Sequence, residues 1–478
     1  MSFRRLAKDT FIYGGADLIG KIMAFFTFPF IAAALSPKAF GALELITTST
    51  ALLSIVMNCG LNNSLQRYYW DTDTHERQRP VLVSSGLAAQ ILFGLAIFAV
   101  GMTAVPWALS EARAGQLPFG WIALMAALFL MIFSQWLQFA LDIVRLHFAP
   151  WSFLTLTLLS RVLGIGLATV VVVFWKGGVD GLLSVQALVA AGVLPLALWM
   201  VRKDLTLNVD VRIAKKLVSF GYPFIFAGLA FWLFGSMDRW MLAKMSSIEE
   251  TGIFSVSFKF ASVVFFISTA FAQAWSPAAI KMRTDHPEIY RTMYANILLL
   301  LLFVMLVAGG GVALFAGEFI SLFMPKSYAA SALPLTILCF GVVIQATQQV
   351  TALGISLEKK THIFARLAWV TAAINLVLNW LLIPSFGAVG AACATSFSHL
   401  VLTSSYLYFS QRLHPLPLPW RKLSLFMLLG TVIATVSIQF RATLFHWDVV
   451  LCKAVIACIC LAIAWTVLPV KGLSYAKP

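Results

Sequence analysis

The stretch TMYANILLLLLFVMLVAGGGVALFA, residues 292–316, decides the fold class of this chain. It contains no charged side chain, and as an α-helix it is long enough to cross the roughly 30 Å hydrocarbon core of a bilayer. Comparable runs recur along all 478 residues, of which 60% are hydrophobic and only 11% charged. An ordinary soluble domain has about 25% charged residues, so we expect this chain to lie in a membrane.

The apolar runs predict an all-α integral membrane fold with about fourteen transmembrane helices. Backbone groups in hydrocarbon must be hydrogen-bonded internally, and the runs lack the period-two alternation of a membrane β-barrel, so helices are expected. A short stretch from Pro384 to Gly387 separates the eleventh helix from the twelfth. The expected spans are 11–35, 43–65, 81–105, 119–141, 151–175, 181–200, 218–241, 252–277, 292–316, 332–355, 367–384, 388–410, 423–440 and 448–467.

Lysine and arginine are concentrated in the loops that fall on the same side as the N-terminus. The positive-inside rule makes that side cytoplasmic, and an even number of helices returns the C-terminus to it. The net charge of +15 therefore reflects topology and does not indicate a nucleic-acid-binding patch. The first apolar run is too long for a signal peptide, whose apolar region is about 7–15 residues. We expect a multi-pass protein of the bacterial inner membrane with both termini in the cytoplasm.

The first and seventh predicted helices begin alike, which suggests an internal duplication. Ala7-Lys8 opens one and Ala214-Lys215 opens the other, and a glycine (Gly41 or Gly252) opens the helix that follows each. Helices interrupted by Gly or Pro in matching positions of two halves point to the binding region of a transporter. The interrupting residues are Gly20, Pro29, Pro223, Gly228 and Gly235.

Four predicted helices carry polar side chains every three or four residues, which places these side chains on one helix face. The stripes are Thr47, Thr50, Ser54, Asn58, Asn62 and Gln66; Gln135, Gln138, Asp142 and Arg145; Ser255, Lys259, Ser262, Thr269 and Gln273; and Gln345, Gln348, Gln349 and Ser356. Hydrogen bonds between helices explain any one stripe, but four stripes together favour a hydrated cavity. The candidates for lining the cavity or for coupling are Asp17, Asn58, Asn62, Gln66, Asp142, Arg145, Gln345 and Gln348.

We single out three basic residues that fall inside predicted spans, where a charge is costly and usually functional: Lys21, Arg161 and Lys259. Lys21 lies four residues after Asp17, so a local ion pair is the alternative to a contact with an anion. For Lys259 the alternative is that its ammonium group reaches the membrane surface. Arg161 lies near the middle of its span and has no acidic residue one turn away. We predict that these three cations bind an anionic substrate in the cavity.

Other signatures of chemistry are missing from the sequence. There is no Gly-x-x-x-x-Gly-Lys-[Ser/Thr] loop, no His-Glu-x-x-His motif and no predicted loop long enough for a catalytic domain. The six cysteines show no metal-site spacing. Asp238-Arg239 is expected to form an interfacial cap or an ion pair between the two lobes. His399 is expected to be a core histidine bonded to a neighbour rather than a proton carrier. We therefore expect a transporter without catalytic residues, metal or cofactor.

Three motifs along the chain carry a family resemblance. They are Leu35-Ser36-Pro37-Lys38-Ala39-Phe40-Gly41; Phe220-Gly221-Tyr222-Pro223 through Asp238-Arg239 to Gly252; and Asn375-Leu376-x-x-Asn379, Ile383-Pro384 and Gly387-x-x-Gly390-Ala391-Ala392-x-Ala394-Thr395. Their order and spacing resemble the Wzx-type O-antigen flippases in the polysaccharide transport branch of the MOP superfamily. The resemblance extends over nearly the whole chain. It departs from the family at Phe254, where the family often has Tyr.

This resemblance implies two pseudo-symmetric six-helix lobes around a central cavity, residues 1–205 and 206–410, followed by a helix pair within 411–478. It implies a flippase that moves undecaprenyl-pyrophosphate-linked oligosaccharide, an O-antigen or other repeat unit of lipopolysaccharide biosynthesis, from the cytoplasmic to the periplasmic leaflet by alternating access. The cationic residues would then hold the pyrophosphate or acidic sugars. The implied partners are the lipid-linked oligosaccharide, membrane lipids, a polysaccharide polymerase and a chain-length regulator, but no nucleic acid.

Other functions are compatible with parts of this pattern. A lipid II flippase would share the fold and the mechanism. A cation-coupled drug antiporter of the same superfamily would be expected to carry net negative charge in its cavity. The intramembrane charges singled out above, Asp17 with Lys21, Arg161 and Lys259, instead sum to +2. A non-transporting membrane enzyme or scaffold of polysaccharide assembly belongs to a different class, and turnover of labelled substrate by the purified protein would distinguish it.

Overall fold

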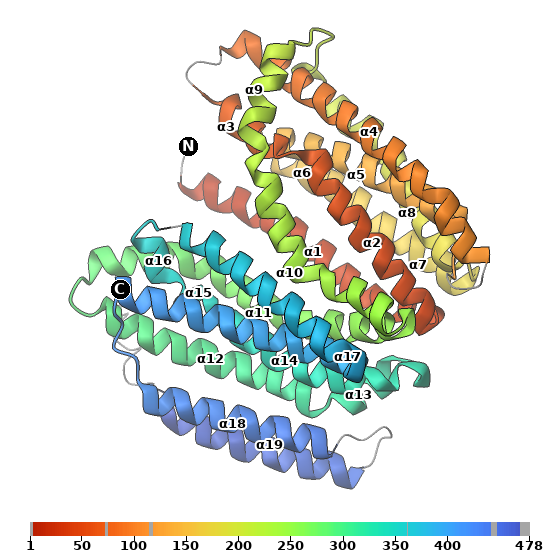
Figure 1. The fold of residues 1–478 in the computed structure, drawn as a ribbon. Helices are drawn as coiled ribbons and strands as arrows, with labels where there is room; N and C mark the ends of the chain where they lie inside the picture. The colour runs from red at the N-terminus through yellow and green to blue at the C-terminus, as the bar shows by residue number, and fades with distance from the viewer. Residues whose placement is uncertain (1–2, 72–74, 114–117, 361, 441–446, 469–478) are drawn as a thin grey trace. The chain divides into compact units, whose positions relative to one another are not determined.

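The computed structural model describes residues 3–71, 75–113, 118–360, 362–440 and 447–468, and the regular structure in these ranges is entirely helical (Figure 1). This confirms the expected all-α membrane fold. The chain divides into two compact units, Met1–Leu233 and Phe234–Pro478. The division lies inside one helix, whereas the sequence places a boundary near residue 205.

Unit 1 contains helices α1 to α9 and the first part of α10. Within it, α5 and α8 pack along each other, and α7 lies beside α8. Short 3-10 turns cover Glu76–Gln78 and Arg202–Asp204, and a π-helical turn, Leu158–Leu163, joins α6 to α7. The helices are α1 Phe3–Ala34, α2 Pro37–Asn58, α3 Leu61–Tyr69, α4 Arg79–Arg113, α5 Trp121–Leu146, α6 Pro150–Thr157, α7 Gly164–Phe174, α8 Gly178–Met200, α9 Val211–Gly221 and α10 Pro223–Met245.

Unit 2 contains the rest of α10 and helices α11 to α19. Helix α14 packs against α11, α12 and α17, and α18 packs against α12. A 3-10 helix, Lys326–Ser331, leads into α14. The helices are α11 Ile248–Asp285, α12 Tyr290–Leu314, α13 Ala316–Phe323, α14 Ala332–Ala346, α15 Gln348–Thr351, α16 Leu353–Leu357, α17 His362–Leu413, α18 Trp420–Gln439 and α19 Trp447–Val467.

The number of membrane spans agrees with the sequence once two irregular helices are considered. Within the described ranges, 12 helical stretches are long and apolar enough to cross a membrane, and α9 with α10, bent by 42°, makes a thirteenth. Helix α17 has 52 residues, which would measure about 78 Å if straight, more than twice the hydrocarbon thickness. It therefore supplies two spans, which gives the expected fourteen.

Helix α17 reverses direction at Gly387, so that its two halves run back along each other (Figure 1). Gly387 has φ 52° and ψ −130°, a conformation that favours glycine. The Glu250 carboxylate of α11 accepts a 2.7 Å hydrogen bond from the backbone N–H of Ala388, and it thereby caps the second half. A side chain on Gly390 would meet the Leu382 carbonyl oxygen at 2.5 Å. The turn lies where the sequence separates the eleventh and twelfth spans.

The second span is broken rather than continuous. Cys59 and Gly60, between α2 and α3, have φ of 46° and 65°. Gly60 packs directly on Gly221 at the end of α9, and a Cβ on Gly60 would lie 2.2 Å from the Gly221 carbonyl oxygen. The expectation of one continuous polar stripe along this helix is therefore wrong, because two left-handed residues change the direction of the chain within it.

Matching spans of the two units begin with the same cap. Ser36 caps α2 and accepts a 3.2 Å hydrogen bond from the backbone N–H of Ala39. Ser247 caps α11 and accepts a 3.0 Å hydrogen bond from the backbone N–H of Glu250. A serine at this position satisfies one of the free N–H groups of the first helical turn. The shared cap supports the internal duplication inferred from the sequence.

Three loops meet at one end of unit 1. The Tyr69 hydroxyl, at the end of α3, donates a 2.7 Å hydrogen bond to Asp204. His147, which follows α5, lies 3.0 Å from the other oxygen of the same carboxylate. Burial alone would raise the pKa of Asp204, but the hydrogen bonds from His147 and Tyr69 outweigh it and lower that pKa. These loops follow the second, fourth and sixth predicted spans, which the topology places on one side.

The corresponding loops meet in unit 2. The Tyr290 hydroxyl lies 3.0 Å from Nε2 of His414, and Nδ1 of the same imidazole lies 3.7 Å from Glu358. Arg283 is 3.9 Å from this carboxylate. Burial lowers the pKa of His414, and the nearby Arg291 and Arg283 lower it further. Each unit thus ends in a cluster of tyrosine, histidine and carboxylate.

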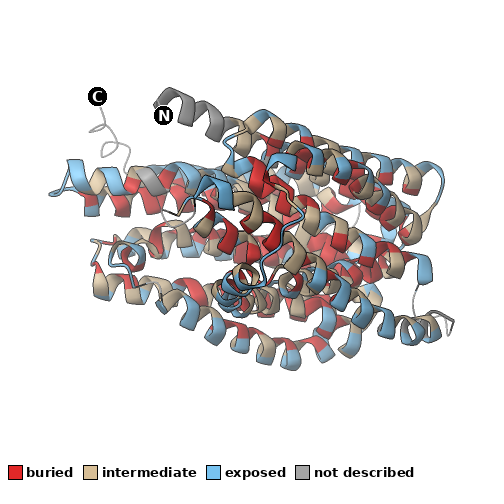
Figure 2. Cartoon of the chain, turned by 90° about the horizontal axis from the view of Figure 1, so that it is seen from above, coloured by how far each residue is buried: buried red, intermediate tan, exposed pale blue. Residues whose placement is uncertain are grey.

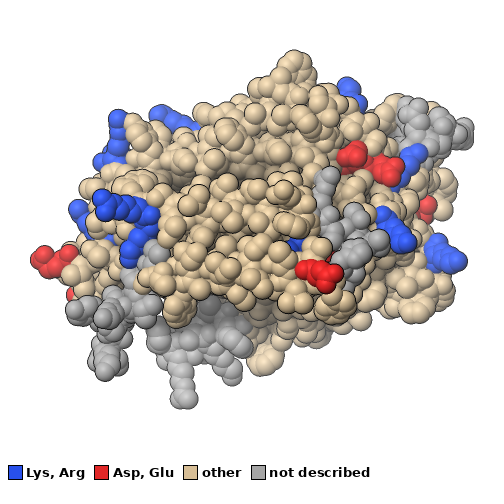
Figure 3. Space-filling view, turned by 90° about the horizontal axis from the view of Figure 1, so that it is seen from below, with Lys and Arg blue, Asp and Glu red and all other residues tan. Residues whose placement is uncertain are grey.

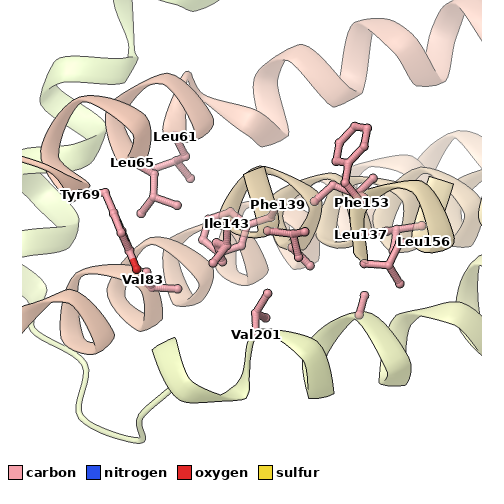
Figure 4. Close-up of a cluster of buried hydrophobic side chains, with 14 of the residues drawn as sticks. Leu61, Leu65, Tyr69, Val83, Leu137, Phe139, Ile143, Phe153, Leu156 and Val201 are labelled. Carbon is pink, nitrogen blue, oxygen red and sulfur yellow. The ribbon is translucent and has the colours of Figure 1, made fainter. Parts of the chain in front are cut away.

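Buried residues lie mainly on the sides of the helices that face neighbouring helices (Figure 2). In unit 1, a buried apolar cluster joins α3, α4, α5, α6 and the end of α8 (Figure 4). Large apolar side chains also point outward, including Phe231 at 71% and Leu188 at 70% exposure, as expected for contact with lipid. On the face displayed in Figure 3, charged residues gather toward the two ends, with a broad band of uncharged residues between them.

Candidate functional site

Arg161 lies on the π-helical turn Leu158–Leu163. A π-helical turn widens the helix by one residue, and such turns are frequent at functional sites. The surrounding helices α6 and α7 form a single span, Pro150–Phe174, so the turn lies inside the membrane-spanning part. The irregularity therefore coincides with the charge that the sequence singled out in this span.

Arg161 lines a cavity of about 300 Å³ between α5, the π-helical turn and α8, which we call the unit 1 cavity. Its other polar lining groups are two hydroxyls and two amides, from Ser134, Ser160, Gln138 and Gln186. The described lining residues include no Asp or Glu. One guanidinium with amide and hydroxyl donors suits an anion that presents several oxygens.

The side chain of Arg161 passes over Gly20 of α1. A Cβ on Gly20 would lie 3.1 Å from Cδ of Arg161, so the absence of a side chain there gives the arginine its path. Lys21 is the next residue along α1, and it is exposed. The structure thus brings the part of α1 that holds Lys21 next to Arg161. The side chain of Asp17 lies outside the described residues.

Asp142 lies behind the unit 1 cavity. Its carboxylate, which is 3% exposed, accepts hydrogen bonds from Gln138 at 3.2 Å and from Arg145 at 3.4 Å. Gln138 therefore connects the cavity wall to a buried carboxylate. The Arg145 guanidinium lies 4.9 Å from the Phe153 ring centre. Neither Asp142 nor Arg145 is among the residues that line the unit 1 cavity, and their predicted lining or coupling role stays a prediction.

The candidates on the second span are separated by the break in that span. Asn58 ends α2, whereas Asn62 and Gln66 belong to α3. Gln66 is exposed, and Oδ1 of Asn62 is buried without a hydrogen-bond partner in the described part of the chain. None of the three lines the unit 1 cavity.

Unit 2 has a cavity of similar size and different chemistry. This unit 2 cavity, of about 320 Å³, lies between α11, α15, α16 and the start of α17. Gln348 lines it and donates a 2.9 Å hydrogen bond to Thr403. Trp275, Gln349 and Phe364 also line it, and the lining residues within the described ranges include no charged side chain. Gln348 thus lines a cavity within unit 2, and its predicted place in a central cavity stays a prediction.

Two other predicted candidates of unit 2 lie away from its cavity. Lys259 is half-buried in α11, and Gln345 is half-buried at the end of α14. Neither is among the residues that line the unit 2 cavity. The structure thus places one predicted cation, Arg161, on a cavity wall. Lys21 follows Gly20, which contacts Arg161, and Lys259 lies away from the unit 2 cavity.

Asp238 and Arg239 are buried inside unit 2, at 2% and 5% exposure. Arg239 donates a 2.7 Å hydrogen bond to the Gly235 carbonyl and lies 3.1 Å from Asp238. Its guanidinium stands 4.7 Å from the Phe258 ring centre. The expected interfacial cap is wrong, because α10 continues to Met245. The ion pair joins two adjacent residues of α10 within unit 2, so it is not the pair between lobes that the sequence suggested.

The polar motif of α17 forms a buried network. Asn379 donates a 3.0 Å hydrogen bond to Asn375, which donates at 3.2 Å to Ser398. His399 packs edge-on against Phe234 at 5.1 Å, and its Nδ1 has no hydrogen-bond partner within the described part of unit 2. His399 is therefore buried in the core as expected, but at Nδ1 no described residue forms the hydrogen bond expected with a neighbour.

The sequence analysis missed one buried charge pair. Lys453 of α19 is 1% exposed, and its ammonium group lies 2.6 Å from the carboxylate of Glu318 on α13. Lys453 falls within the last predicted span, so it could have been included with the other intramembrane cations. Among the residues that the structure describes, no group of His, Cys, Asp or Glu could hold a metal ion.

Solved structures with the same fold are transporters. The lipid II flippase MurJ in an inward closed conformation has a TM-score of 0.74 at 14% identity, over 96% of this chain and 99% of that one. An inward-facing multidrug resistance MATE family transporter of the MOP superfamily has a TM-score of 0.61 at 12% identity, over 82% of this chain and 94% of that one. The chain therefore has the same fold as these two structures, as the sequence resemblance implied.

The sequence comparisons define the family. Residues 6–283, more than half of the chain, match the family described as polysaccharide biosynthesis protein, and the chain belongs to that family. A relative described as "Probable low-salt glycan biosynthesis flippase Agl15", from Haloferax volcanii, is 18% identical over 406 residues, which are 84% of this chain and 83% of the relative.

Proposed function

We propose that this protein is a flippase that moves an anionic, lipid-linked oligosaccharide of a surface polysaccharide, such as an O-antigen repeat unit, from the cytoplasmic to the periplasmic leaflet. Family membership supports the link to polysaccharides, and the fold supports transport rather than catalysis. The observation that carries the proposal is the guanidinium of Arg161 on the wall of a polar cavity inside a membrane-spanning unit.

The chemistry of the cavity suits a phosphate-bearing head group. An anionic head cannot cross hydrocarbon alone, because an unpaired charge costs many kcal/mol to desolvate. A charge-assisted hydrogen bond offsets about 1.5–3 kcal/mol of this cost. We take the carrier to be undecaprenyl pyrophosphate, whose lipid tail stays in the bilayer while the head moves. Outward movement of about two negative charges releases about 4–5 kcal/mol at an inside-negative potential of about 100 mV.

Lys21 and Lys259 are proposed as further contacts of the anionic head. Lys21 is exposed on α1 one residue from the contact between Gly20 and Arg161. Charge reversal with Lys21→Glu should reduce surface polysaccharide more than Lys21→Arg, and equal effects would indicate a packing role. Lys259→Ala should lower surface polysaccharide without loss of membrane insertion, and normal polysaccharide would remove Lys259 from the site.

Reconstitution tests the proposed function. Purified protein in proteoliposomes should move a fluorescent undecaprenyl-pyrophosphate oligosaccharide between leaflets, as measured by quenching from outside the vesicles. Arg161→Gln should slow this movement at least tenfold, whereas Arg67→Gln, at an exposed site outside the cavity, should not. Equal rates for Arg161→Gln and the unchanged protein would contradict the proposal.

A lipid II flippase is the second candidate, favoured by the extent of the likeness to MurJ. The same vesicles with labelled lipid II in place of the oligosaccharide would distinguish the two. A cationic dye tests the antiporter alternative, which the guanidinium in the unit 1 cavity disfavours. Failure of the purified protein to move any of these would favour a scaffold, for which co-purification with a polymerase or chain-length regulator is the measurement.

A further inference from the structure

We propose that the segment from Arg202 to Lys216, which follows α8 and includes the start of α9, is an interfacial element that binds the anionic lipid surface of the leaflet it faces. The segment lies at the end of unit 1 where the loops of Tyr69 and His147 meet Asp204. The positive-inside rule makes this end cytoplasmic. The proposal does not depend on which substrate the protein moves.

Three apolar side chains of the segment project into open space. Leu207 is fully exposed, Val209 is 46% exposed and Val211 is 64% exposed. They occupy alternate positions of a stretch that is non-helical up to the start of α9. Exposed apolar residues that directly continue a membrane-spanning helix are expected to enter the lipid boundary region.

The backbone that carries Leu207 and Val209 is held in place by hydrogen bonds, so the exposure of these side chains is a feature of the fold. The Ser84 hydroxyl of α4 accepts a 2.8 Å hydrogen bond from the backbone N–H of Thr206, and Ser85 accepts one of 2.9 Å from the backbone N–H of Asp210. Asp210 in turn caps α9. The loop is therefore held at both ends of its apolar stretch, and its apolar side chains are held away from the core.

The end of the segment is fixed as well. Leu217 of α9 is fully buried, and its carbonyl accepts a 2.7 Å hydrogen bond from the Ser64 hydroxyl. Gly221 packs against Gly60. Since these contacts fix the rotation of α9, its basic residues Arg212 and Lys215 remain exposed on the other face.

The exposed charge of the segment is strongly basic. Its exposed basic residues are Arg202, Lys203, Arg212, Lys215 and Lys216. Of its two acidic residues, Asp204 is buried against Tyr69, which leaves Asp210 as the exposed acid. A basic surface that surrounds exposed apolar side chains complements anionic lipid head groups, because both parts gain from the same partner. A soluble acidic partner would not account for the apolar side chains.

An aromatic residue indicates the level of the membrane boundary. Trp199, near the end of α8, is 58% exposed. The Arg202 guanidinium lies 4.3 Å from its ring centre and donates a 2.9 Å hydrogen bond to its carbonyl. Tryptophan is enriched where hydrocarbon meets head groups. The segment thus starts at that boundary.

The test measures lipid retention by the full chain. Delipidated protein in detergent would be titrated with phosphatidylglycerol or with phosphatidylcholine, and bound lipid counted by native mass spectrometry. The unchanged protein should retain phosphatidylglycerol in preference, and high salt should weaken retention. A triple variant, Lys203→Gln with Arg212→Gln and Lys215→Gln, should retain at least threefold less.

A matched control removes the same charge elsewhere. Lys176→Gln with Lys244→Gln and Lys326→Gln changes three exposed lysines on predicted external loops and should leave retention unchanged. Leu207→Ser with Val209→Ser should reduce retention while keeping every charge. Equal retention of the two lipids, or equal losses in the control and the segment variant, would overturn the proposal. Unchanged retention in both segment variants would do so too, and would favour a soluble partner.

Discussion

The two units handle charge in different ways. Unit 1 places a guanidinium, that of Arg161, on its cavity wall beside amides and hydroxyls. Unit 2 lines its cavity with glutamine and aromatic side chains, and it holds the ion pairs Asp238–Arg239 and Lys453–Glu318 away from that cavity. The two units therefore contain cavities of similar size whose linings differ in chemistry. The unit 1 cavity suits an anion, and the unit 2 cavity suits a neutral, hydroxyl-rich group.

The largest expected effect is on the flipping rate, and it distinguishes the roles of the two cavities. Arg161→Gln should slow flipping by about ten- to a hundredfold, because a charge-assisted hydrogen bond is worth about 1.5–3 kcal/mol. Gln348→Leu, in unit 2, removes a neutral hydrogen bond and should slow it by less than about tenfold. Initial rates in proteoliposomes measure both. A larger effect of Gln348→Leu would reverse the proposed roles of the two cavities.

The ion pairs of unit 2 should affect stability rather than flipping selectivity. Glu318→Gln leaves the buried ammonium of Lys453 without its carboxylate and should destabilise the protein by about 3–5 kcal/mol. Thermal unfolding in detergent measures this loss. The double variant Glu318→Leu with Lys453→Met should recover most of it, since both charges are then gone. A stable Glu318→Gln protein would show that the pair is not buried in the membrane-embedded state.

The path of Arg161 over α1 offers a milder test of unit 1. Gly20→Ala puts a methyl group 3.1 Å from Cδ of Arg161, so the arginine must shift by a few tenths of an ångström. Flipping should fall about two- to fivefold, although alanine is the better helix former by about 1 kcal/mol. Gly15→Ala on the same helix meets nothing within 4 Å and is the control. Equal losses of flipping rate in Gly20→Ala and Gly15→Ala would show that the effect comes from a change in α1 and not from the contact with Arg161.

The loop clusters of the two units should respond to acid at different pH. The pKa of His414 is lowered by burial and by Arg291 and Arg283, so its protonation below the ordinary value of about 6.5 opposes folding, and the unit 2 cluster weakens as pH falls from 7 to 5. The lowered pKa of Asp204 stabilises unit 1 above about pH 3.9, and this contribution is lost only under stronger acid.

Hydrogen exchange of the loops measures this smallest effect. Exchange near Glu358 and His414 should rise between pH 7 and 5, after correction for the intrinsic rate, before exchange near Asp204 does. His414→Gln should remove the difference in unit 2, whose cluster also contains Tyr290 and Arg283. A rise in hydrogen exchange at the same pH in both clusters would contradict the predicted difference between the two units.

Local sequence predicts much of the fold because membrane spans are local features. Apolar length defines the helices, and Pro384 to Gly387 correctly predicts the reversal in α17. Arg161 was identified from its charge alone, because a charge in hydrocarbon is conspicuous.

Features that depend on distant contacts could not be predicted in this way. The left-handed break at Cys59–Gly60 is accommodated by the bare backbone of Gly221, far along the chain. The π-helical turn at Arg161 contains no Gly or Pro within Leu158–Leu163 that would indicate it. The partner of Lys453 is 135 residues earlier, and the burial of Asp238 depends on helices packed around it.

The pairing of Lys453 with Glu318 has a consequence for biosynthesis. A lysine at the centre of an inserting helix costs about 2.5–3.5 kcal/mol on translocon scales, and Lys453 lies in the first half of α19. The ribosome makes α13 before α19, so the carboxylate is already in place when the lysine emerges. When α19 inserts, the bilayer therefore already contains Glu318, the counter-ion of Lys453. In a chain from which α13 was deleted, α19 would have to insert with its lysine unpaired.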